Sequence, residues 1–217
     1  MLSIKKYAAI DIGSNAVRLL ISNIIEQKGK PVLFKKNSLV RVPIRLGSDV
    51  FLNNKISKEN TQRIIDTMLA FKLLMKSHRV VKYKACATSA MRESTNGKQV
   101  VDLVLKHSGI SIDIIEGEEE AAIIAATDLT AYIDKSKTYL YVDVGGGSTE
   151  FTVIHEGNSV ASKSFKIGTV RLLNDIVSKE AWQELEKWIK TFTHTYDKIA
   201  VLGSGGNINK IFKVSGK

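Results

Sequence analysis

Two glycine turns, each preceded by an aspartate, carry the residues with the clearest chemistry. The first is Asp11-Ile12-Gly13-Ser14-Asn15, and the second is Asp143-Val144-Gly145-Gly146-Gly147-Ser148. A glycine turn between strands lets the backbone approach a ligand closely, and it directs successive N–H groups into a concavity that suits phosphate oxygens. The side chains of Ser14, Asn15 and Ser148 add donors there. We therefore expect both turns to bind phosphate.

The carboxylates beside these turns could hold a metal ion. Asp11 and Asp143 end the strands that precede the turns, and Glu150 follows the second turn closely. Mg²⁺ usually takes one or two carboxylates together with water and substrate phosphate. A tight hairpin, with the aspartate bonded to its own turn, is the alternative for either turn alone. The presence of two copies favours the phosphate interpretation.

Charged side chains elsewhere are further candidates. Acidic residues crowd the start of a predicted helix at Glu116, Glu118, Glu119 and Glu120. The helix dipole favours acidic residues there, but their place between the two halves of the chain also makes them candidate site carboxylates. Arg92 follows a strand end and could bind phosphate bidentately, although an exposed helix arginine is the alternative. Arg18 could join it only by pointing inward from its strand.

A third glycine segment, Gly203-Ser204-Gly205-Gly206-Asn207, lies between a predicted strand and a predicted helix. It lacks the last glycine of the dinucleotide-binding fingerprint, so NAD binding is a weak interpretation, and the second turn lacks the Gly-Lys-Ser/Thr of a P-loop. A glycine turn that opens a helix still offers free N–H groups. The segment at Gly203, Gly205 and Gly206 is therefore a candidate nucleotide loop.

An internal repeat relates the two halves, because Asp143 lies 132 residues after Asp11 and each is followed by a glycine turn and an aliphatic strand. This spacing exceeds any solenoid period and indicates a duplicated domain. We expect two related α/β lobes that face each other across a cleft, residues 1–125 and 126–217. Two unrelated hairpins are the alternative.

The expected elements fit α/β layers. Apolar patterns predict strands at residues 7–13, 16–25, 31–34, 80–87 and 110–115, and then at 138–144, 148–154, 160–165 and 199–202. Helices are expected at residues 57–77, 100–109, 118–132, 170–177 and 179–193, and from residue 206 onward, with a short helical piece after residue 88.

Composition bounds the class of protein. The 217 residues have Lys+Arg 32 and Asp+Glu 22, a formal charge of +10, and 44% hydrophobic residues, which excludes collagen, low-complexity disorder and a disulfide scaffold. Cys86 is the only cysteine, so a reducing compartment fits. Neither a membrane span nor a secretion signal is evident, and we expect a cytoplasmic protein. The charge suits nucleic acid, an anionic membrane or a polyanionic small ligand.

At these residues the sequence resembles the exopolyphosphatase/guanosine pentaphosphatase (Ppx/GppA) family, within the actin/Hsp70/sugar-kinase superfamily. Single motifs are weak, but together and in order they are specific. They are Ile10 to Leu19, Arg45-Leu46-Gly47, Ala87 to Arg92 with Asn96, Gly117 to Ala121, Asp143 to Glu150, Gly168-Thr169-Val170-Arg171-Leu172 and Gly203 to Asn207.

The resemblance implies two actin-like, ribonuclease H-like lobes and a Mg²⁺-dependent hydrolase acting in the cleft. Its substrate would be inorganic polyphosphate, or guanosine pentaphosphate at the 5′-γ-phosphate, and we expect neither DNA nor membrane as a partner. The family's catalytic glutamate corresponds to Glu120, with Glu119 as the alternative, and Asp143 and Glu150 would hold metal or water. The phosphate-binding residues would be Asp11, Gly13, Ser14, Asn15, Arg18, Arg92, Gly145, Gly146, Gly147 and Ser148. Related proteins are commonly homodimers.

Two departures from the family pattern favour a second hypothesis. Ala122 stands where an arginine usually follows the catalytic Glu-Ala pair, and family members continue beyond the position of Lys217. We therefore expect a second lobe that is incomplete at its C-terminus. A non-catalytic sensor that binds polyphosphate or nucleotide is the alternative function. A sugar or acetate kinase is disfavoured, because the motifs follow the phosphatase pattern.

Overall fold

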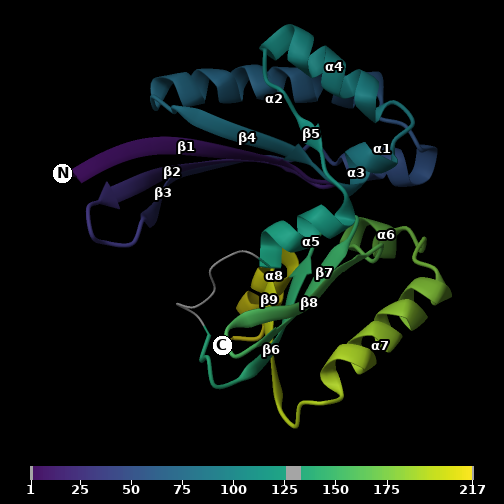
Figure 1. Cartoon of the computed structure of the whole chain (residues 1–217). Helices are drawn as coiled ribbons and strands as arrows, with labels where there is room; N and C mark the ends of the chain where they lie inside the picture. The colour runs from purple at the N-terminus through teal and green to yellow at the C-terminus, as the bar shows by residue number, and fades with distance from the viewer. Residues whose placement is uncertain (1, 126–132, 217) are drawn as a thin grey trace. The chain divides into compact units, whose positions relative to one another are not determined.

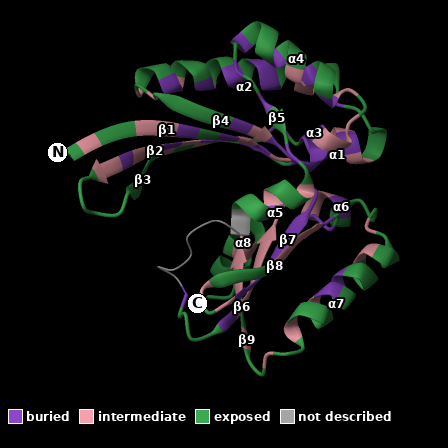
Figure 2. Ribbon diagram, in the orientation of Figure 1, coloured by how far each residue is buried: buried purple, intermediate pink, exposed green. Residues whose placement is uncertain are grey.

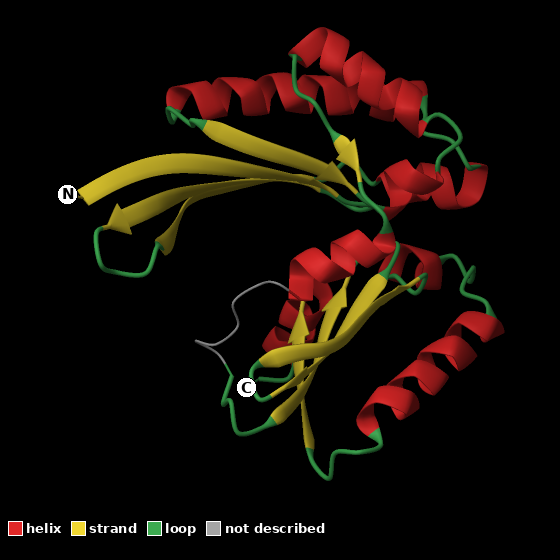
Figure 3. Cartoon of the chain, in the orientation of Figure 1, coloured by secondary structure: helices red, strands yellow, loops and turns green. Residues whose placement is uncertain are grey.

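A computed structural model describes residues 2–125 and 133–216 of the chain (Figure 1). The chain divides into two compact units, Met1–Ile115 and Glu116–Lys217, and each unit has its own sheet and helices (Figure 3). This division falls after residue 115 rather than the expected residue 125. The reason is that helix α5 (Gly117–Ala125) packs on strands of the second unit.

The first unit is a five-stranded sheet in the order β3-β2-β1-β4-β5. β1 pairs with β2 in antiparallel and with β4 in parallel orientation. The strands are β1 (Leu2–Ile12), β2 (Val17–Gln27), β3 (Leu33–Val42), β4 (Lys82–Ala87) and β5 (Asp113–Ile114). The helices are α1 (Leu46–Asn53), α2 (Lys58–Ser77), α3 (Ser89–Glu93) and α4 (Gly97–Ser108).

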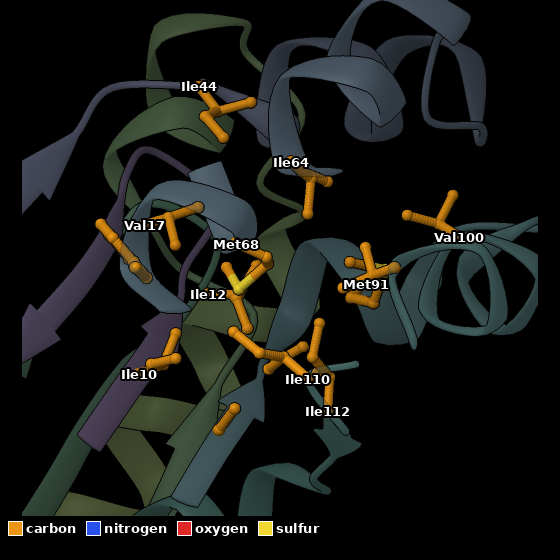
Figure 4. Close-up of a cluster of buried hydrophobic side chains, with 14 of the residues drawn as sticks. Ile10, Ile12, Val17, Ile44, Ile64, Met68, Met91, Val100, Ile110 and Ile112 are labelled. Atoms are coloured by element: carbon orange, nitrogen blue, oxygen red, sulfur yellow. The ribbon is translucent and has the colours of Figure 1, made fainter. Parts of the chain in front are cut away.

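The core of the first unit lies between this sheet and helices α2 and α4, which cover one of its faces (Figure 1). Alternate residues of a strand point to opposite faces, so Ile10 and Ile12 are buried whereas Asp11 is only partly covered. Figure 2 shows buried and exposed residues mixed along the strands and helices of this unit. Ile10 and Ile12 pack in one apolar cluster with Ile64 and Met68 of α2 and Met91 of α3 (Figure 4). The core thus fixes the strand ends from which the first glycine turn projects.

The second unit repeats this topology in a four-stranded sheet of order β8-β7-β6-β9. β6 pairs with β7 in antiparallel and with β9 in parallel orientation, as β1 does with β2 and β4. The strands are β6 (Thr138–Val144), β7 (Thr149–His155), β8 (Asn158–Phe165) and β9 (Ile199–Ser204). Besides α5, the helices are α6 (Thr169–Leu173), α7 (Lys179–Thr193) and α8 (Gly206–Val214). The α/β class and the internal repeat are therefore confirmed.

The two faces of the second sheet differ in polarity. On one face, Phe151 and Phe165 pack with Trp188 of α7. On the other face lie Asp143, Glu150 and the hydroxyl groups of Tyr141, Thr152, Ser162 and Ser164. Helix α5 lies on this polar face, where the Ser162 hydroxyl donates to the Ala121 carbonyl at 3.3 Å.

Several elements differ from the sequence-based expectations. Helix α1 was not expected, and it begins after Arg45, whose left-handed backbone (φ 63°) gives no recognisable cap. β3 extends to Val42 rather than ending near residue 34, and the polar run Lys35-Lys36-Asn37-Ser38 in its middle hides it from an apolar pattern. β5 has only two residues. Residues 126–132 of the helix expected over 118–132 lie outside the described residues. None of the described helices is long and apolar enough to cross a bilayer.

Asn96, part of a motif quoted above, has a structural role that can be tested. Its side chain accepts from the Ile56 N–H and donates to the Ile56 carbonyl, both at 2.9 Å. Replacing Asn96 by Ala leaves two buried backbone groups without partners, so we expect a loss of about 1–3 kcal/mol in the free energy of unfolding, measured with urea. Gln99→Ala, on the exposed side of α4, should leave stability unchanged. Equal stability of the two variants would contradict this role for Asn96.

Candidate functional site

The two glycine turns share one backbone hydrogen bond at equivalent positions. The Gly13 N–H donates to the Ala16 carbonyl at 3.1 Å, and the Gly145 N–H donates to the Ser148 carbonyl at 2.9 Å. Each turn therefore closes the first hairpin of its unit at equivalent positions. The predicted phosphate-binding residues of each turn are brought together, with Ser14 and Ser148 buried and Asn15 exposed.

Arginine and aspartate are paired beside the first turn. Asp11 and Arg18 lie directly opposite each other on β1 and β2, and an Arg18 guanidinium nitrogen lies 3.0 Å from Asp11 Oδ2. Both side chains are nearly half exposed. Arg18 thus reaches the sheet face that carries Asp11, and part of its charge is balanced by that carboxylate. Its role toward phosphate stays a prediction.

Two carboxylates face each other beside the second turn. Asp143 of β6 and Glu150 of β7 are register partners, and Glu150 is only 3% exposed. The Ser164 hydroxyl donates to Glu150 Oε1 at 2.8 Å. Burial raises the pKa of Glu150 above its ordinary value, and the nearby Asp143 carboxylate adds to the rise, although hydrogen bonds from Ser148 and Ser164 oppose it.

This pair suits a hard divalent cation. A buried carboxylate beside a second carboxylate is costly to ionise, and a cation bound by both would remove that cost. Among the described residues no group of three or more His, Cys, Asp or Glu side chains could hold a metal ion. Two carboxylates are nevertheless what Mg²⁺ commonly takes from a protein when phosphate oxygens and waters complete its shell. The donor set therefore fits Mg²⁺.

The acidic helix lies in the same unit as this pair. Glu118 and Glu119 are exposed at the start of α5, whereas Glu120 is half-buried and its Oε2 atom is shielded from solvent. Helix α5 packs on β7 and β8, the strands that carry Glu150 and Ser164. The second unit alone therefore contains the second turn, both metal-ligand candidates and both candidates for the catalytic glutamate.

Helix α3 lies against the first turn. The Thr88 N–H donates to the Ile12 carbonyl at 3.2 Å, and the buried hydroxyl groups of Ser14 and Ser89 are 2.9 Å apart. Arg92 is half-buried on this helix, and its Nη1 donates to the Ile115 carbonyl at 2.6 Å. Its predicted role toward phosphate stays a prediction, and the structure adds a role in holding the segment before α5.

The third glycine segment lies beside the carboxylate pair. Gly205 has φ 98°, a conformation that favours glycine, and a Cβ there would lie 2.7 Å from the Val144 carbonyl and 3.2 Å from Asp143 Oδ1. The Tyr141 hydroxyl donates to Ser204 at 2.9 Å. The expected strand–turn–helix context of this segment is confirmed, since it joins β9 to α8.

Comparison with known proteins identifies the family. The model of the Ppx/GppA phosphatase family matches residues 24–199. The chain belongs to this family. The resemblance seen in the sequence motifs is therefore confirmed.

Individual Ppx/GppA relatives are longer than this chain. It is 33% identical to a bifunctional 3-dehydroquinate synthase/phosphatase of Fusobacterium nucleatum, over 76% of this chain and 25% of that protein. It is 32% identical to a guanosine-5′-triphosphate,3′-diphosphate pyrophosphatase of Photobacterium profundum, over 77% of this chain and 32% of that protein. It is 29% identical to exopolyphosphatase 2 of Mycobacterium tuberculosis, over 79% of this chain and 54% of that protein. The chain thus spans between a quarter and about half of these relatives.

A solved structure of the family agrees with the fold. An exopolyphosphatase from Cytophaga hutchinsonii matches 97% of this chain with a TM-score of 0.80, at 22% sequence identity, and the match covers 70% of that chain. The two-sheet actin-like α/β fold expected from the motifs is therefore confirmed.

Sequence reasoning gave no role to two motifs that contact the turns. Arg171 is only 8% exposed, and its Nε donates to the Gly147 carbonyl at 2.7 Å. The Gly47 N–H likewise donates to the Ser14 carbonyl at 2.7 Å. Both residues stand in motifs of the family, and this was the only feature of the sequence that could have pointed to their contacts with the turns. Ser164, which bonds Glu150, belongs to no motif and gave no signal.

The raised pKa of Glu150 predicts a dependence of stability on pH. The folded protein holds the carboxyl proton more tightly than the unfolded chain does. With metal removed by a chelator, the free energy of unfolding should therefore fall as pH rises from about 4 through the raised pKa. Glu150→Gln removes this ionisation cost, so it should unfold at a higher urea concentration than the wild type at pH about 7, and not at pH about 4.

An exposed glutamate gives a control of opposite sign. A hydrogen bond from its own backbone, with one from Ser178, lowers the pKa of Glu180. Glu180→Gln should consequently lower stability at neutral pH rather than raise it. A wild type that is as stable as Glu150→Gln at neutral pH in chelator would contradict the burial argument.

Proposed function

We propose that this chain carries the catalytic site of a Ppx/GppA phosphoanhydride hydrolase. It would release the terminal phosphate of inorganic polyphosphate or the 5′-γ-phosphate of guanosine pentaphosphate. The observation that carries the proposal is the Asp143–Glu150 carboxylate pair beside a glycine turn, in which Glu150 is buried. Family membership and the names of the relatives, exopolyphosphatase and guanosine-5′-triphosphate,3′-diphosphate pyrophosphatase, support the same reaction.

Each residue of the second unit has a distinct role in this proposal. The N–H groups of the second turn bind oxygens of the phosphoryl group to be released. Asp143 and Glu150 would hold Mg²⁺, which would supply positive charge against the phosphoryl oxygens. Glu120 takes the proton of the attacking water, with Glu119 as the alternative. The water oxygen bonds to the terminal phosphorus, and the bond from that phosphorus to the bridging oxygen breaks. Orthophosphate and a shortened chain are the products.

The first unit and the surface charge contribute to substrate binding. The first turn, from Gly13 to Asn15, together with Arg18 and Arg92, is proposed to bind further phosphoryl groups. The formal charge of +10 favours a substrate with several phosphates, because the summed field attracts a polyanion. A homodimer in the cytoplasm is the proposed state of the protein.

The proposal predicts chelator-sensitive phosphate release that depends on Glu120. With polyphosphate and guanosine pentaphosphate assayed side by side, Glu120→Gln should lower the rate about 100-fold or more, since a general base contributes that much. EDTA should abolish release, and added Mg²⁺ should restore it. Glu118→Gln, an exposed residue on the same helix, is the matched control and should keep its activity.

The outcomes separate the hypotheses. Loss of activity in Glu119→Gln but not in Glu120→Gln would identify Glu119 as the general base. Full activity of both variants, or release that persists in chelator, would refute the proposed mechanism. Tight binding of polyphosphate by the pure protein with no turnover would instead favour the non-catalytic sensor. Among the described site residues, this alternative rests on Ala122, which stands where an arginine usually follows the Glu-Ala pair.

A further inference from the structure

The two glycine turns share a feature that the phosphate interpretation alone does not require. In each unit, a segment that follows the third strand of the sheet donates hydrogen bonds to carbonyl oxygens of the turn. We call residues 45–47 and 168–171 the carbonyl-binding segments. They are the motifs Arg45-Leu46-Gly47 and Gly168-Thr169-Val170-Arg171, which have no role in the reaction proposed above.

In the second unit, the turn carbonyls are bonded one after another. The Thr169 N–H donates to the Gly145 carbonyl at 3.1 Å, and the Val170 N–H donates to the Gly146 carbonyl at 2.8 Å. The buried Arg171 side chain reaches the Gly147 carbonyl at 2.7 Å. The Thr169 hydroxyl adds a longer bond of 3.3 Å to the Gly145 carbonyl.

The first unit has the same arrangement with different residues. The Gly47 N–H donates to the Ser14 carbonyl at 2.7 Å, and the Arg45 N–H donates to the Asn15 carbonyl at 3.0 Å. Arg45 adopts φ 63° to do so, an unfavourable conformation for an arginine. The arrangement therefore recurs with a different turn sequence, which argues that the orientation of the carbonyls is the shared requirement.

Fixing a carbonyl also fixes the N–H group of the next residue. The described peptide bonds are trans, so that N–H points in the direction opposite to the carbonyl. The N–H groups of Gly146 and Gly147, and those of Asn15 and Ala16 in the other turn, therefore point away from the carbonyl-binding segments. Within residues 2–125 and 133–216 these N–H groups have no hydrogen-bond acceptor.

The absence of a side chain at position 168 makes the contact close. A Cβ on Gly168 would lie 2.4 Å from the Gly146 carbonyl oxygen and 2.5 Å from the Gly147 carbonyl carbon, both backbone atoms that cannot move aside cheaply. Gly168 therefore has to be glycine for the segment to reach the turn, whatever the ligand.

We propose that Gly168-Thr169-Val170-Arg171 is a positioning segment that prevents the glycine peptides of the second turn from flipping. Glycine accepts either peptide orientation at similar cost, and a flipped peptide would present a carbonyl oxygen to the phosphate. The carbonyl bonds favour the orientation in which the N–H groups face the ligand. Thr169 and Arg171 are thus positioning residues for phosphate binding, and this inference rests on the proposed function of the turn.

Thr169→Pro tests the inference by separating the segment from the turn while keeping a residue that suits the start of α6. Thr169 is the first residue of α6, where proline is favoured, and the preceding Gly168 has the extended backbone (φ −137°, ψ 160°) that proline requires. The substitution removes both bonds from Thr169 to the Gly145 carbonyl. The proline ring carbon also takes the place of the hydrogen that faces this oxygen, so it moves the segment away from the turn. Lys179→Pro is the matched control, because Lys179 is the first residue of α7 and follows an extended Ser178.

The measurement uses methylenediphosphonate with Mg²⁺ as a probe that is not hydrolysed. Calorimetry gives the dissociation constant, and the amide nitrogen shifts of Gly146 and Gly147 report on the turn itself. We expect wild type and Lys179→Pro to bind alike with shifts at both amides. Thr169→Pro and Arg171→Ala should bind roughly tenfold more weakly, with those shifts lost.

Each outcome decides between the inference and the proposed function. If both variants bind the probe as the wild type does, with the same amide shifts, the positioning role is wrong while the phosphate site stands. If the wild type does not bind the probe, or binds without shifting Gly146 and Gly147, both proposals fail. Should Arg171→Ala not fold, Thr169→Pro alone decides the question.

Discussion

The site depends on one constraint: a glycine turn has no side chains to hold its peptides, so other parts of the chain must fix their orientation. The segments after β3 and β8 do this by donating to the turn carbonyls. They can reach the turns because the third strand of each unit runs antiparallel to the second. It therefore returns the chain to the end of the strands at which the glycine turn lies. The duplicated sheet order thus gives each unit one turn with its N–H groups directed outward.

The two copies of this frame differ at one decisive pair of positions. Opposite Asp11 stands Arg18, and the two form an ion pair. Opposite Asp143 stands Glu150, so the equivalent position holds a second carboxylate that is almost fully buried. The first unit therefore has a neutral pair beside its turn, whereas the second has an excess of negative charge that a divalent cation would balance. The asymmetry supports assigning the metal to the second unit alone.

Much of this could be predicted from the sequence, because the signals were local. The Asp-x-Gly turns, the repeat and the strand–turn–helix at Gly203 are short patterns with direct geometric meaning. Helix α1 and the length of β3 could not be predicted, since a left-handed Arg45 gives no cap signal and the polar run Lys35 to Ser38 interrupts the apolar pattern of β3. The contact of Ser164 with Glu150 depends on the register of β7 with β8, which no local pattern specifies.

The motifs that identify the family combine two kinds of residue. Asn96 holds Ile56, Gly168 admits a close backbone approach, and Arg171 bonds a turn carbonyl, so these three maintain the frame. Glu150 differs from them, because a buried carboxylate beside a second one, Asp143, lowers stability unless a ligand offsets the cost of its ionisation. Residues that cost stability in a well-ordered frame are best explained by function. The transfer of an activity to this chain therefore rests on those carboxylates rather than on the number of matching motif residues.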